Sequence, residues 1–593
     1  MQNHYSIESA FSTVYLDLPE DNSNWQAELS SFSPQPGISV ISFTIRSATP
    51  QIPPCCNFSW SIPQHDIAFR WYCACDRRDH MPPNWGGRRG SQLAYSAPVM
   101  TLYNQSGLNR FSFAASEAKR EVGFGAGVNE YNSNIDCFVA FFESPEAPRT
   151  EYSAQIIVNT EAIFYADAIR KIFDWYADMD EYQVAPAPEA AFDLLYSSWY
   201  SYHKDNLHSD IVQRQLGYAA QYGMKTLIVD DGWQTDRYNG GPYAYCGDWQ
   251  PVVSRFPNMK EHVKKVHEAG FKYILWYSVP FVGEKSENFA RFQGKYLYTR
   301  LTDAHILDPR FPEVREFLIS TYENAVREWD LDGFKLDFID SFPVAYANDP
   351  AVAENFGNGR DCKTVPEGVD KLMTGVITRL RQIKSDILIE FRQNYIGPAI
   401  RKYGNILRAA DCPGDLLLNR VRTIDLRITA SPQTAIHSDM LTWNYSDSAE
   451  VAARQFLAIL FSVPQISVRL EEIPPLHGRM LKFWTGFWTE HRDLLLFGHL
   501  KPFHPELNYP LVQSELEEEE IFAIYLGQQV ITPTSGKTTY LVNGSENTDI
   551  TVDLSASRLI KVYNTLGELT ADLELPPGLH RLNVPISGLA RLD

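Results

Sequence analysis

The pattern of hydrophobic and polar residues differs between successive parts of the chain. Up to about residue 185 they form short alternating runs, such as 37–45 and 155–158, separated by Pro, Asn and Gly. Successive side chains of a strand point to opposite faces, so this alternation predicts an N-terminal β-sandwich. A helical stretch at 162–179 and a Pro/Ala linker at 184–190 follow.

After the linker the pattern changes, and it predicts short apolar strands that alternate with amphipathic helices. Eight such units over roughly 300 residues predict a (β/α)8 TIM barrel. A doubly wound sheet is the alternative, but no glycine-rich phosphate loop follows any strand. The expected strands are 192–199, 226–232, 272–278, 333–338, 386–392, 405–410, 434–439 and 465–470, and the expected helices are 208–222, 256–269, 312–329, 368–384, 447–462 and 480–492.

Strand patterns return after about residue 510, and an acidic run at 515–520 precedes them, which we expect in a solvated loop. The predicted fold class is therefore multidomain α/β, with a central (β/α)8 TIM barrel between an N-terminal β-sandwich and a C-terminal antiparallel β-domain. The predicted domains are the sandwich at 1–185, the catalytic barrel at 186–505 and a C-terminal β-sandwich domain at 506–593.

Composition narrows the class of protein. The chain has 593 residues, of which 44% are hydrophobic and 21% charged, and these values exclude a disordered or collagen-like chain. The net charge of −20 argues against a nucleic-acid partner, since binding phosphates requires clustered Lys and Arg. Aromatic residues make up 13% of the chain. An acidic, aromatic chain suits carbohydrate binding, and it equally suits an aromatic core.

The N-terminal residues show no signal-peptide pattern and no run of 18 apolar residues occurs, so we expect a cytoplasmic protein without a membrane span. A trimmed secreted or periplasmic form stays open. The eight cysteines do not suggest a disulfide framework. Cys55, Cys56, Cys73 and Cys75 lack the C-x2-C spacing of zinc sites, so we predict buried thiols and no metal.

The catalytic groups of such a barrel project from the C-terminal ends of its strands. Each acid there has a structural alternative, because an Asp after a strand is often a helix N-cap, as Asp415 and Asp439 could be. Acids, cations and aromatics crowd the predicted ends: Trp199 on the first strand, Asp230, Asp231 and Trp233 on the second, Trp276 on the third, Lys335 and Asp337 on the fourth, Arg392 on the fifth, Asp411 on the sixth and Asp439 on the seventh.

Two separated acids beside aromatic rings suit glycoside hydrolysis. Asp337 and Asp411 can converge across the barrel mouth, where a retaining pair stands ~5–5.5 Å apart. Lys335, two residues before Asp337, shares its side of the strand and is expected to keep Asp337 ionised, unless the two form only a structural ion pair. A serine hydrolase lacks its G-x-S-x-G motif here, a metal site lacks paired histidines, and the acid chemistry requires no cofactor.

Several motifs resemble those of the α-galactosidases of glycoside hydrolase family 36, the melibiase family. They are Leu-Ile-Val-Asp-Asp-Gly-Trp at 227–233, Gly-Asp-Trp at 247–249, Arg-Phe-Pro-Asn at 255–258, Leu-Asp-Pro-Arg-Phe-Pro-Glu-Val-Arg at 307–315, Lys-x-Asp at 335–337, and Asp411 with Asp415. Their order and spacing match over about 190–500, and the flanking β-domains match the family's layout.

The resemblance implies a retaining double displacement on a sugar. It assigns Asp337 as nucleophile and Asp411 as acid/base. It places Asp230 and Asp231 on the O4 and O6 of galactose and Lys335 on ring hydroxyls. Trp199, Trp233 and Trp276 are then expected around the sugar, and Arg392 and Asp415 join the predicted substrate-binding set.

The sequence departs from the family in its recognition residues. The fifth strand normally ends Glu-x-Cys-Ser-Gly-Gly-Gly-Arg, and here Arg392 replaces a small contact near the C2 position of the sugar. Arg392 is a candidate to hold a substituent or an acidic group, or to form an internal ion pair with Glu390 or Asp411. The family's Ser-Asp-Asn-Thr-Asp on the sixth strand reads Ala-Asp-Cys-Pro-Gly-Asp at 410–415, and its Glu on strand three is Ser278.

The leading hypothesis is a retaining exo-glycoside hydrolase that acts on terminal α-galactosides of oligosaccharides. Four alternatives stay open: a hydrolase for a modified galactoside, one for an α-N-acetylgalactosaminide, an α-galactosyl transglycosylase, and an inactive sugar-binding homologue. The expected partner is an oligosaccharide or glycoside, with no nucleic acid and no membrane; a homo-oligomer is left open.

Overall fold

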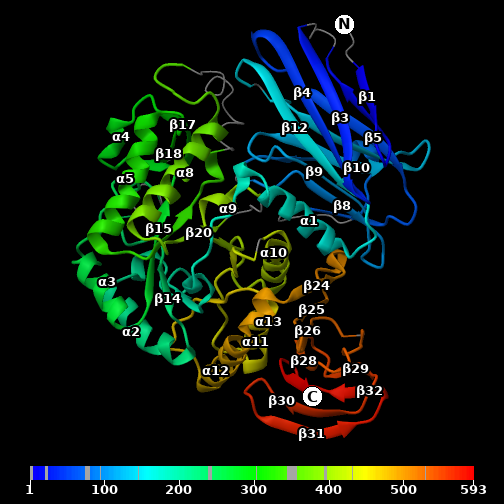
Figure 1. Ribbon diagram of the computed structural model, residues 1–593. Helices are drawn as coiled ribbons and strands as arrows, with labels where there is room; N and C mark the ends of the chain where they lie inside the picture. The colour runs from blue at the N-terminus through cyan, green and yellow to red at the C-terminus, as the bar shows by residue number, and fades with distance from the viewer. Residues whose placement is uncertain are drawn as a thin grey trace.

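The computed structural model describes residues 4–19, 24–73, 80–93, 95–144, 146–237, 243–301, 303–342, 357–392, 397–430, 432–527 and 529–593. A pair of β-sheets, a parallel barrel wrapped by helices, and a second pair of sheets follow one another along the chain (Figure 1). The predicted fold class is confirmed.

Two six-stranded antiparallel sheets form the N-terminal sandwich. Alternate residues of each strand face the core, so β5 (Cys56–Pro63) buries Phe58, Trp60 and Ile62 and turns the residues between them outward. The first sheet has the order β1 (His4–Glu8), β2 (Thr13–Asp17), β5, β11 (Asn134–Phe141), β10 (Val122–Val128), β7 (Arg88–Ser91); the second has β3 (Trp25–Gln35), β4 (Ile38–Gln51), β12 (Arg149–Asn159), β9 (Asn109–Ala115), β8 (Val99–Tyr103), β6 (Phe69–Tyr72).

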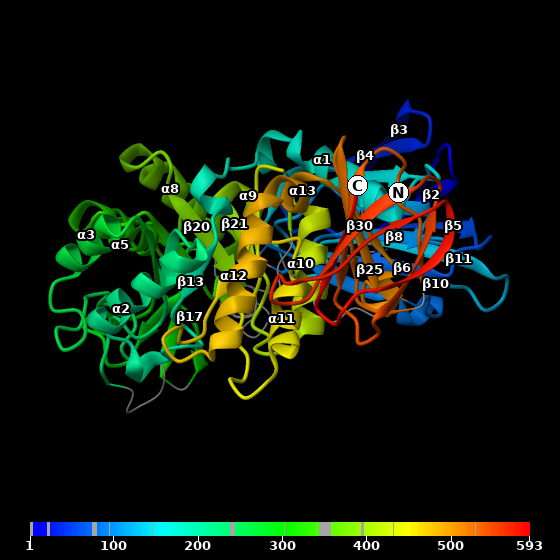
Figure 2. The same cartoon turned by 90° about the horizontal axis from the view of Figure 1, so that it is seen from below.

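Helix α1 (Tyr165–Ala177) joins the sandwich to the barrel. It contacts β8 and β9 on one side and the barrel helix α10 (Leu416–Thr429) on the other, and it lies between the two bodies in both views (Figures 1 and 2). The Trp71 indole of β6 donates a hydrogen bond to Asp425 of α10 over 3.3 Å. These contacts tie the sandwich firmly to the barrel.

The barrel contains eight parallel strands, one in each predicted range. The strand β13 pairs with the last strand β23 through Leu195 and Gln465, and His437 bridges to Val463, so the ring is nearly closed. In barrel order the strands are β13 (Leu195–Ser197), β14 (Thr226–Val229), β15 (Lys272–Ser278), β19 (Gly333–Asp337), β20 (Leu388–Arg392), β21 (Ile406–Arg408), β22 (Ala435–His437) and β23 (Gln465–Ile466).

The helices around the barrel begin where their sequences offer caps. Asn258 and Thr364 accept hydrogen bonds from the third residue after them, which satisfies amides that have no partner within the helix. The helices that overlap the predicted ranges are α2 (Ser209–Ala219), α3 (Met259–Glu268), α5 (Pro312–Trp329), α8 (Val365–Ile383), α11 (Ala449–Ala458) and α12 (Pro475–Glu490).

Other elements of this region were not predicted. Helix α10 fills the connection between β21 and β22, and β16 (Phe281–Gly283), β17 (Tyr296–Leu301) and β18 (Ala304–Leu307) form a small antiparallel sheet after β15. The described part of this region also contains the short helices α4 (Asn288–Arg291), α9 (Ile400–Tyr403) and α13 (Arg492–Phe497).

The C-terminal body begins earlier than the predicted boundary at 506, because β24 starts at His499. Most of its strand pairs are antiparallel, but β26 pairs with β28, and β27 with β29, in parallel. One sheet has the order β24 (His499–Phe503), β25 (Leu511–Glu515), β26 (Glu519–Ile524), β28 (Thr538–Asn543), β33 (Leu589–Leu592), β30 (Arg558–Tyr563), β31 (Leu569–Leu575); the other has β27 (Val530–Ile531), β29 (Asp549–Leu554), β32 (Gly578–Asn583).

The acidic run at 515–520 is not simply a solvated loop, as the sequence led us to expect. Glu520 lies within β26 and is fully buried. Its carboxylate accepts hydrogen bonds from the side chains of Gln513, Thr534 and Thr539 at 2.9–3.0 Å. These donors replace water around the charge and so make its burial tolerable.

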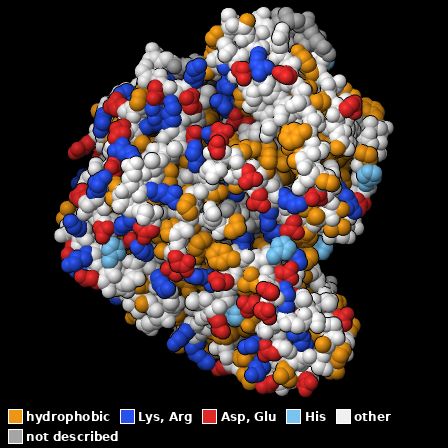
Figure 3. Space-filling model, viewed as in Figure 1, with side chains coloured by type: hydrophobic (Ala, Val, Ile, Leu, Met, Phe, Trp, Pro, Cys, Tyr) orange, Lys and Arg blue, Asp and Glu red, His pale blue; other side chains and the backbone are white. Residues whose placement is uncertain are grey.

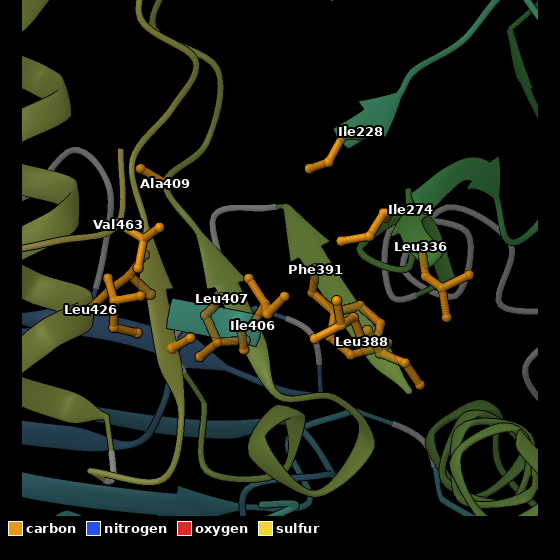
Figure 4. Close-up of a cluster of buried hydrophobic side chains, with 14 of the residues drawn as sticks. Ile228, Ile274, Leu336, Leu388, Phe391, Ile406, Leu407, Ala409, Leu426 and Val463 are labelled. Carbon is orange, nitrogen blue, oxygen red and sulfur yellow. The ribbon is translucent and has the colours of Figure 1, made fainter. Parts of the chain in front are cut away.

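Apolar side chains of neighbouring barrel strands meet in one cluster. Figure 4 shows Ile228 of β14, Ile274 of β15 and Leu336 of β19 beside Leu388 of β20 and Ile406 of β21. All five are at most 1% exposed. This packing fixes the strand ends that carry the polar residues.

Acidic and basic side chains are interspersed over the face shown in Figure 3, including the barrel at its left. The net negative charge is therefore not gathered into one patch on this face. Among the described helices, none has both the length and the hydropathy that crossing a membrane requires.

Candidate active site

The parallel strands bring the predicted residues to one rim of the barrel. Asp230 and Asp231 follow the last residue of β14, Asp337 ends β19, and Arg392 ends β20. Asp411 follows β21 by three residues. Because all these strands run in the same direction, their C-terminal ends share one edge.

Asp337 is held from three directions. The Trp276 indole donates to one carboxylate oxygen, Oδ2, over 3.0 Å, and Arg392 Nε donates to the other, Oδ1, also over 3.0 Å. The backbone N–H of Phe338 also donates to Oδ1, over 2.8 Å. Phe338 has φ 65°, a left-handed conformation that costs about 1–3 kcal/mol in a bulky residue and recurs at functional sites. Asp337 is thus fixed in one orientation at the rim.

The expected partner of Asp337 is corrected by the structure. Lys335 does not pair with Asp337; its ammonium lies 2.5 Å from Asp230 Oδ2, and both side chains are 3% exposed. Arg392 takes the place beside Asp337, so the internal ion pair considered as one alternative for Arg392 forms with Asp337 and not with Glu390 or Asp411. The reason is that Lys335 reaches across the barrel interior to β14, while Arg392 comes from the adjacent strand β20.

The adjacent carboxylates Asp230 and Asp231 have different surroundings. Asp230 is neutralised by Lys335. Asp231 is 2% exposed, accepts a hydrogen bond from Gln234 at 2.7 Å, and lies 3.4 Å from the ammonium of Lys204. Burial raises the pKa of Asp231 to about 6, although Lys204 opposes the shift. The charged form of Asp231 is therefore disfavoured by its burial.

Asp411 lies at the edge of a buried ionic network centred on Arg408. The Arg408 guanidinium donates to Asp411 over 2.9 Å, also donates to Asp439, and lies 3.6 Å from Glu390. Burial favours the neutral form of Asp411, but Arg408, followed by Arg392, holds its pKa well below the ordinary value. The side chain of Asp411 is 41% exposed, whereas those of Arg408, Asp439 and Glu390 are at most 1% exposed.

Two residues of this region have structural roles. Burial lowers the pKa of His437 to about 4, so its ring is neutral. Nε2 donates to the carbonyl of Ala191 over 2.7 Å, and Nδ1 accepts from Gln465 over 3.1 Å, which leaves no ring nitrogen for a metal. Asp439 accepts from Tyr200 over 3.1 Å as well as from Arg408.

The three predicted tryptophans differ in position. Trp199 is partly exposed, and its ring centroid lies 4.0 Å from that of His203. Trp276 is 2% exposed and acts through its hydrogen bond to Asp337. Trp233 is fully buried and donates to the carbonyl of Trp276 over 2.9 Å. Trp233 therefore contacts the backbone of Trp276 from within the core. The prediction that Trp233 forms part of the wall around the sugar is wrong.

Asp415 is a helix N-cap, which is the structural alternative considered for it. Its carboxylate accepts from the backbone N–H of Leu418 over 2.9 Å and caps the N-terminus of α10. The side chain is exposed, and its predicted contact with substrate stays a prediction.

Sequence reasoning missed Arg408 and Lys204. Arg408 ends β21 and stands three residues before Asp411, so a cation at a strand end was a usable signal. Lys204 begins the 3-10 turn η4 (Lys204–Asn206) after β13, and no pattern marks it.

No group of three metal-ligating side chains occurs among the described residues. Cys56 and Cys73 are buried and Cys55 is partly buried, and Cys75 lies outside the described residues.

A family profile and several curated proteins match part of this chain. The Melibiase family profile matches residues 188–349, which carry Asp230, Asp231, Lys335 and Asp337. Alpha-galactosidase 2 of Pediococcus pentosaceus is 30% identical over 133 residues, which cover 21% of this chain and 18% of that protein. The chain spans only about a fifth of the length of the curated relatives first matched.

Solved structures share the fold over almost the whole chain. The galactosidase domain of the alpha-galactosidase-sucrose kinase AgaSK has a TM-score of 0.66 at 13% identity and covers 98% of this chain and 82% of that one. The family 36 alpha-galactosidase AgaA from Geobacillus stearothermophilus in complex with stachyose has a TM-score of 0.63 at 12% identity, with coverages of 100% and 86%. The family match and the relatives support assignment of the chain to the melibiase family, glycoside hydrolase family 36.

Proposed function

We propose that this member of the melibiase family is a retaining exo-glycoside hydrolase that removes terminal α-galactosyl units from oligosaccharides. The observation that carries the proposal is the arrangement at the rim: Asp337 and Asp411 stand on strands two places apart, with Arg392 on the strand between them. Arg392 acts electrostatically on both carboxylates. The stachyose complex of the similar family 36 enzyme supports an oligosaccharide as substrate.

In the proposed first step, Asp337 attacks the anomeric carbon. A bond forms between one of its oxygens and that carbon while the bond to the leaving oxygen breaks, and Asp411 gives a proton to the leaving oxygen. Trp276 and Arg392 hold the two oxygens of Asp337, so the attacking group needs little reorganisation.

In the second step, Asp411 takes a proton from water as the water attacks the same carbon, and Asp337 leaves as a carboxylate. Configuration is retained because the carbon is inverted twice.

Asp411 must carry a proton when it acts as an acid, yet Arg408 holds its pKa low in the structure without substrate. The side chain is 41% exposed, and an aglycone placed over it would remove that hydration. Desolvation disfavours the charged form of a carboxyl, so binding of substrate is expected to raise the pKa of Asp411 and prepare it to donate.

Asp230 and Asp231 are proposed to accept hydrogen bonds from sugar hydroxyls. The ammonium of Lys335 pairs with Asp230 and orients it, and Asp231 becomes charged above about pH 6. Oδ2 of Asp231 is buried and lies 3.4 Å from the ammonium of Lys204, and a carboxylate oxygen can accept a further hydrogen bond from a sugar hydroxyl.

The test is turnover of an aryl α-galactoside by the wild-type chain and by Asp337→Asn. We expect the substitution to abolish turnover, because an amide cannot form the covalent intermediate. Asp386→Asn is the matched control, since this carboxyl is 54% exposed and precedes β20, at the end of the strand opposite the rim. Measurable turnover by Asp337→Asn would remove the nucleophile assignment, and an inactive wild-type chain would remove the α-galactoside.

A second candidate is a galactoside modified near C2, or an α-N-acetylgalactosaminide, because Arg392 stands beside Asp337 with 17% of its side chain exposed. Turnover of the corresponding aryl α-N-acetylgalactosaminide, compared with that of the α-galactoside, separates the two. A preference for the acetamido sugar that Arg392→Gln removes would favour this candidate.

A further inference from the structure

A cavity of about 570 Å³ lies on the outer face of the N-terminal sandwich. The sheet that forms it contains β2, β5 and β11, which lie on the side of the sandwich turned away from the barrel in both views (Figures 1 and 2). Its volume falls within the range of ~300–1,000 Å³ that small-molecule sites occupy.

Strand register places aromatic and hydroxyl side chains next to each other on this face. Tyr15 of β2 pairs with Ser59 of β5, and Ser59 pairs in turn with Phe138 of β11. Ser61 pairs with Asp136 in the same way. All five side chains point outward, since the residues between them fill the sandwich core.

An exposed tryptophan lies beside these side chains, on a turn that packs against the neighbouring strand β10. The outward positions of this strand include Gly125 and Gly127, and a Cβ on Gly127 would lie 2.6 Å from the backbone of Asn84. Because glycine has no side chain, the 3-10 turn η1 (Asn84–Gly86) can lie directly on the sheet at these positions. Trp85 projects from this turn with 77% of its surface exposed, and Tyr15 is 51% exposed.

The polar groups of the cavity are held ready for hydrogen bonding. Asp136 is oriented by the side-chain amides of Asn84 and Asn129 at 2.9 and 2.8 Å. The hydroxyl of Ser61 is buried and has no hydrogen-bond partner within the described part of the chain. Asn57 and Ser59 also line the cavity.

We propose that this cavity is a second, non-catalytic binding site, and that its ligand is a neutral glycan chain. The C–H faces of pyranose rings can stack on Trp85 and Tyr15, because the face of an aromatic ring carries negative charge. The amides, hydroxyls and single carboxylate beside these rings match the alternating donors and acceptors of sugar hydroxyls. A protein partner would instead require a larger continuous apolar surface, since interface cores are depleted in such polar groups.

The position of the cavity separates it from the catalytic rim. A glycan bound there would hold the chain on a polymer while the barrel mouth stays free to act on branches. Only the choice of probe, a polysaccharide with α-galactosyl branches, rests on the proposed function.

The test is native gel electrophoresis through a gel that contains soluble galactomannan, with the full chain carrying Asp337→Asn so that the polymer is not consumed. We expect retardation relative to a gel without polymer. Adding Trp85→Ala should weaken the apparent affinity about tenfold or more, as loss of an aromatic anchor does. Tyr15→Ala is the second variant, and both side chains are exposed enough for replacement to spare the fold. Phe32→Ala, which removes an exposed ring from β3 of the other sheet, is the matched control.

Equal retardation of the Asp337→Asn chain with and without Trp85→Ala or Tyr15→Ala, or no retardation at all, would overturn the proposal. A change from dimer to monomer on Trp85→Ala in sedimentation would overturn it as well, because the surface would then join two copies of the chain. Turnover of a small aryl α-galactoside should be the same with and without Trp85→Ala in the chain that keeps Asp337. This separates failure of the second site from failure of the proposed catalytic function.

Discussion

Asp231 is expected to lower the stability of the folded chain at neutral pH. Burial raises its pKa from 3.8 to about 6, so the folded state binds a proton more tightly than the unfolded state does. Stability therefore falls as pH rises from about 4 to about 6, and the full loss is present above that range. The shift corresponds to about 3 kcal/mol.

Asp231→Asn removes this ionisation and keeps an oxygen to accept from Gln234. The variant should be more stable than wild type by about 3 kcal/mol near pH 8, and by only about 1 kcal/mol near pH 4.5. The matched control is the adjacent Asp230→Asn, which leaves the buried Lys335 without its carboxylate and should be destabilising by about 3 kcal/mol or more. The two neighbours should thus shift stability in opposite directions.

Differential scanning calorimetry across this pH range measures the effect, which should appear as a change of a few degrees in the transition of the barrel. Turnover of the aryl α-galactoside should fall in Asp231→Asn even as the melting temperature rises, a common exchange of stability for activity at binding sites. If Asp231→Asn lowers the melting temperature near pH 8, or changes it equally at every pH, the argument from burial is wrong.

Three further substitutions test other parts of the site. Arg408→Met leaves buried carboxylates without their cation and should lower the free energy of unfolding, measured by heat or urea, by about 3–5 kcal/mol. The same substitution should raise the pKa of Asp411, so the part of the pH–rate profile that depends on Asp411 should shift to higher pH. Asp415→Ala should cost only about 1 kcal/mol in unfolding, with KM unchanged, and a large rise in KM would instead support the predicted contact with substrate. Trp233→Ala should cost about 3–5 kcal/mol, because it empties a fully buried position, and unchanged stability would show that the indole is not part of the core.

The barrel could be predicted because its strands are continuous apolar runs in a regular sequence of βα units. The position of Asp337 could also be predicted, since a strand end fixes the rim to which it belongs. The partner of Asp337 could not, because partners depend on how far side chains reach between strands. Lys335 is near Asp337 in sequence but contacts Asp230, while Arg392 is 55 residues away and contacts Asp337.

The surroundings of buried side chains could not be predicted from the sequence either. Trp233 and Trp276 look alike as aromatic residues at strand ends, yet the Trp276 indole donates to Asp337, whereas the Trp233 indole donates to the backbone carbonyl of Trp276. Glu520 belongs to an acidic run that reads as surface, and only the threonines and the glutamine around it reveal why it can be buried. In each case three-dimensional neighbours decide the role, and these come from distant parts of the chain.

The pairing of β13 with β23 has a consequence for synthesis on the ribosome. Leu195 meets Gln465 only after another 270 residues have been made, so the ring of strands stays open until almost the whole barrel has emerged. During that time the edge of β13 lacks its last partner and can pair with other chains. A nascent or cleaved chain that stops before Gln465 could carry both Asp337 and Asp411 and still lack the closed ring that fixes their relative positions.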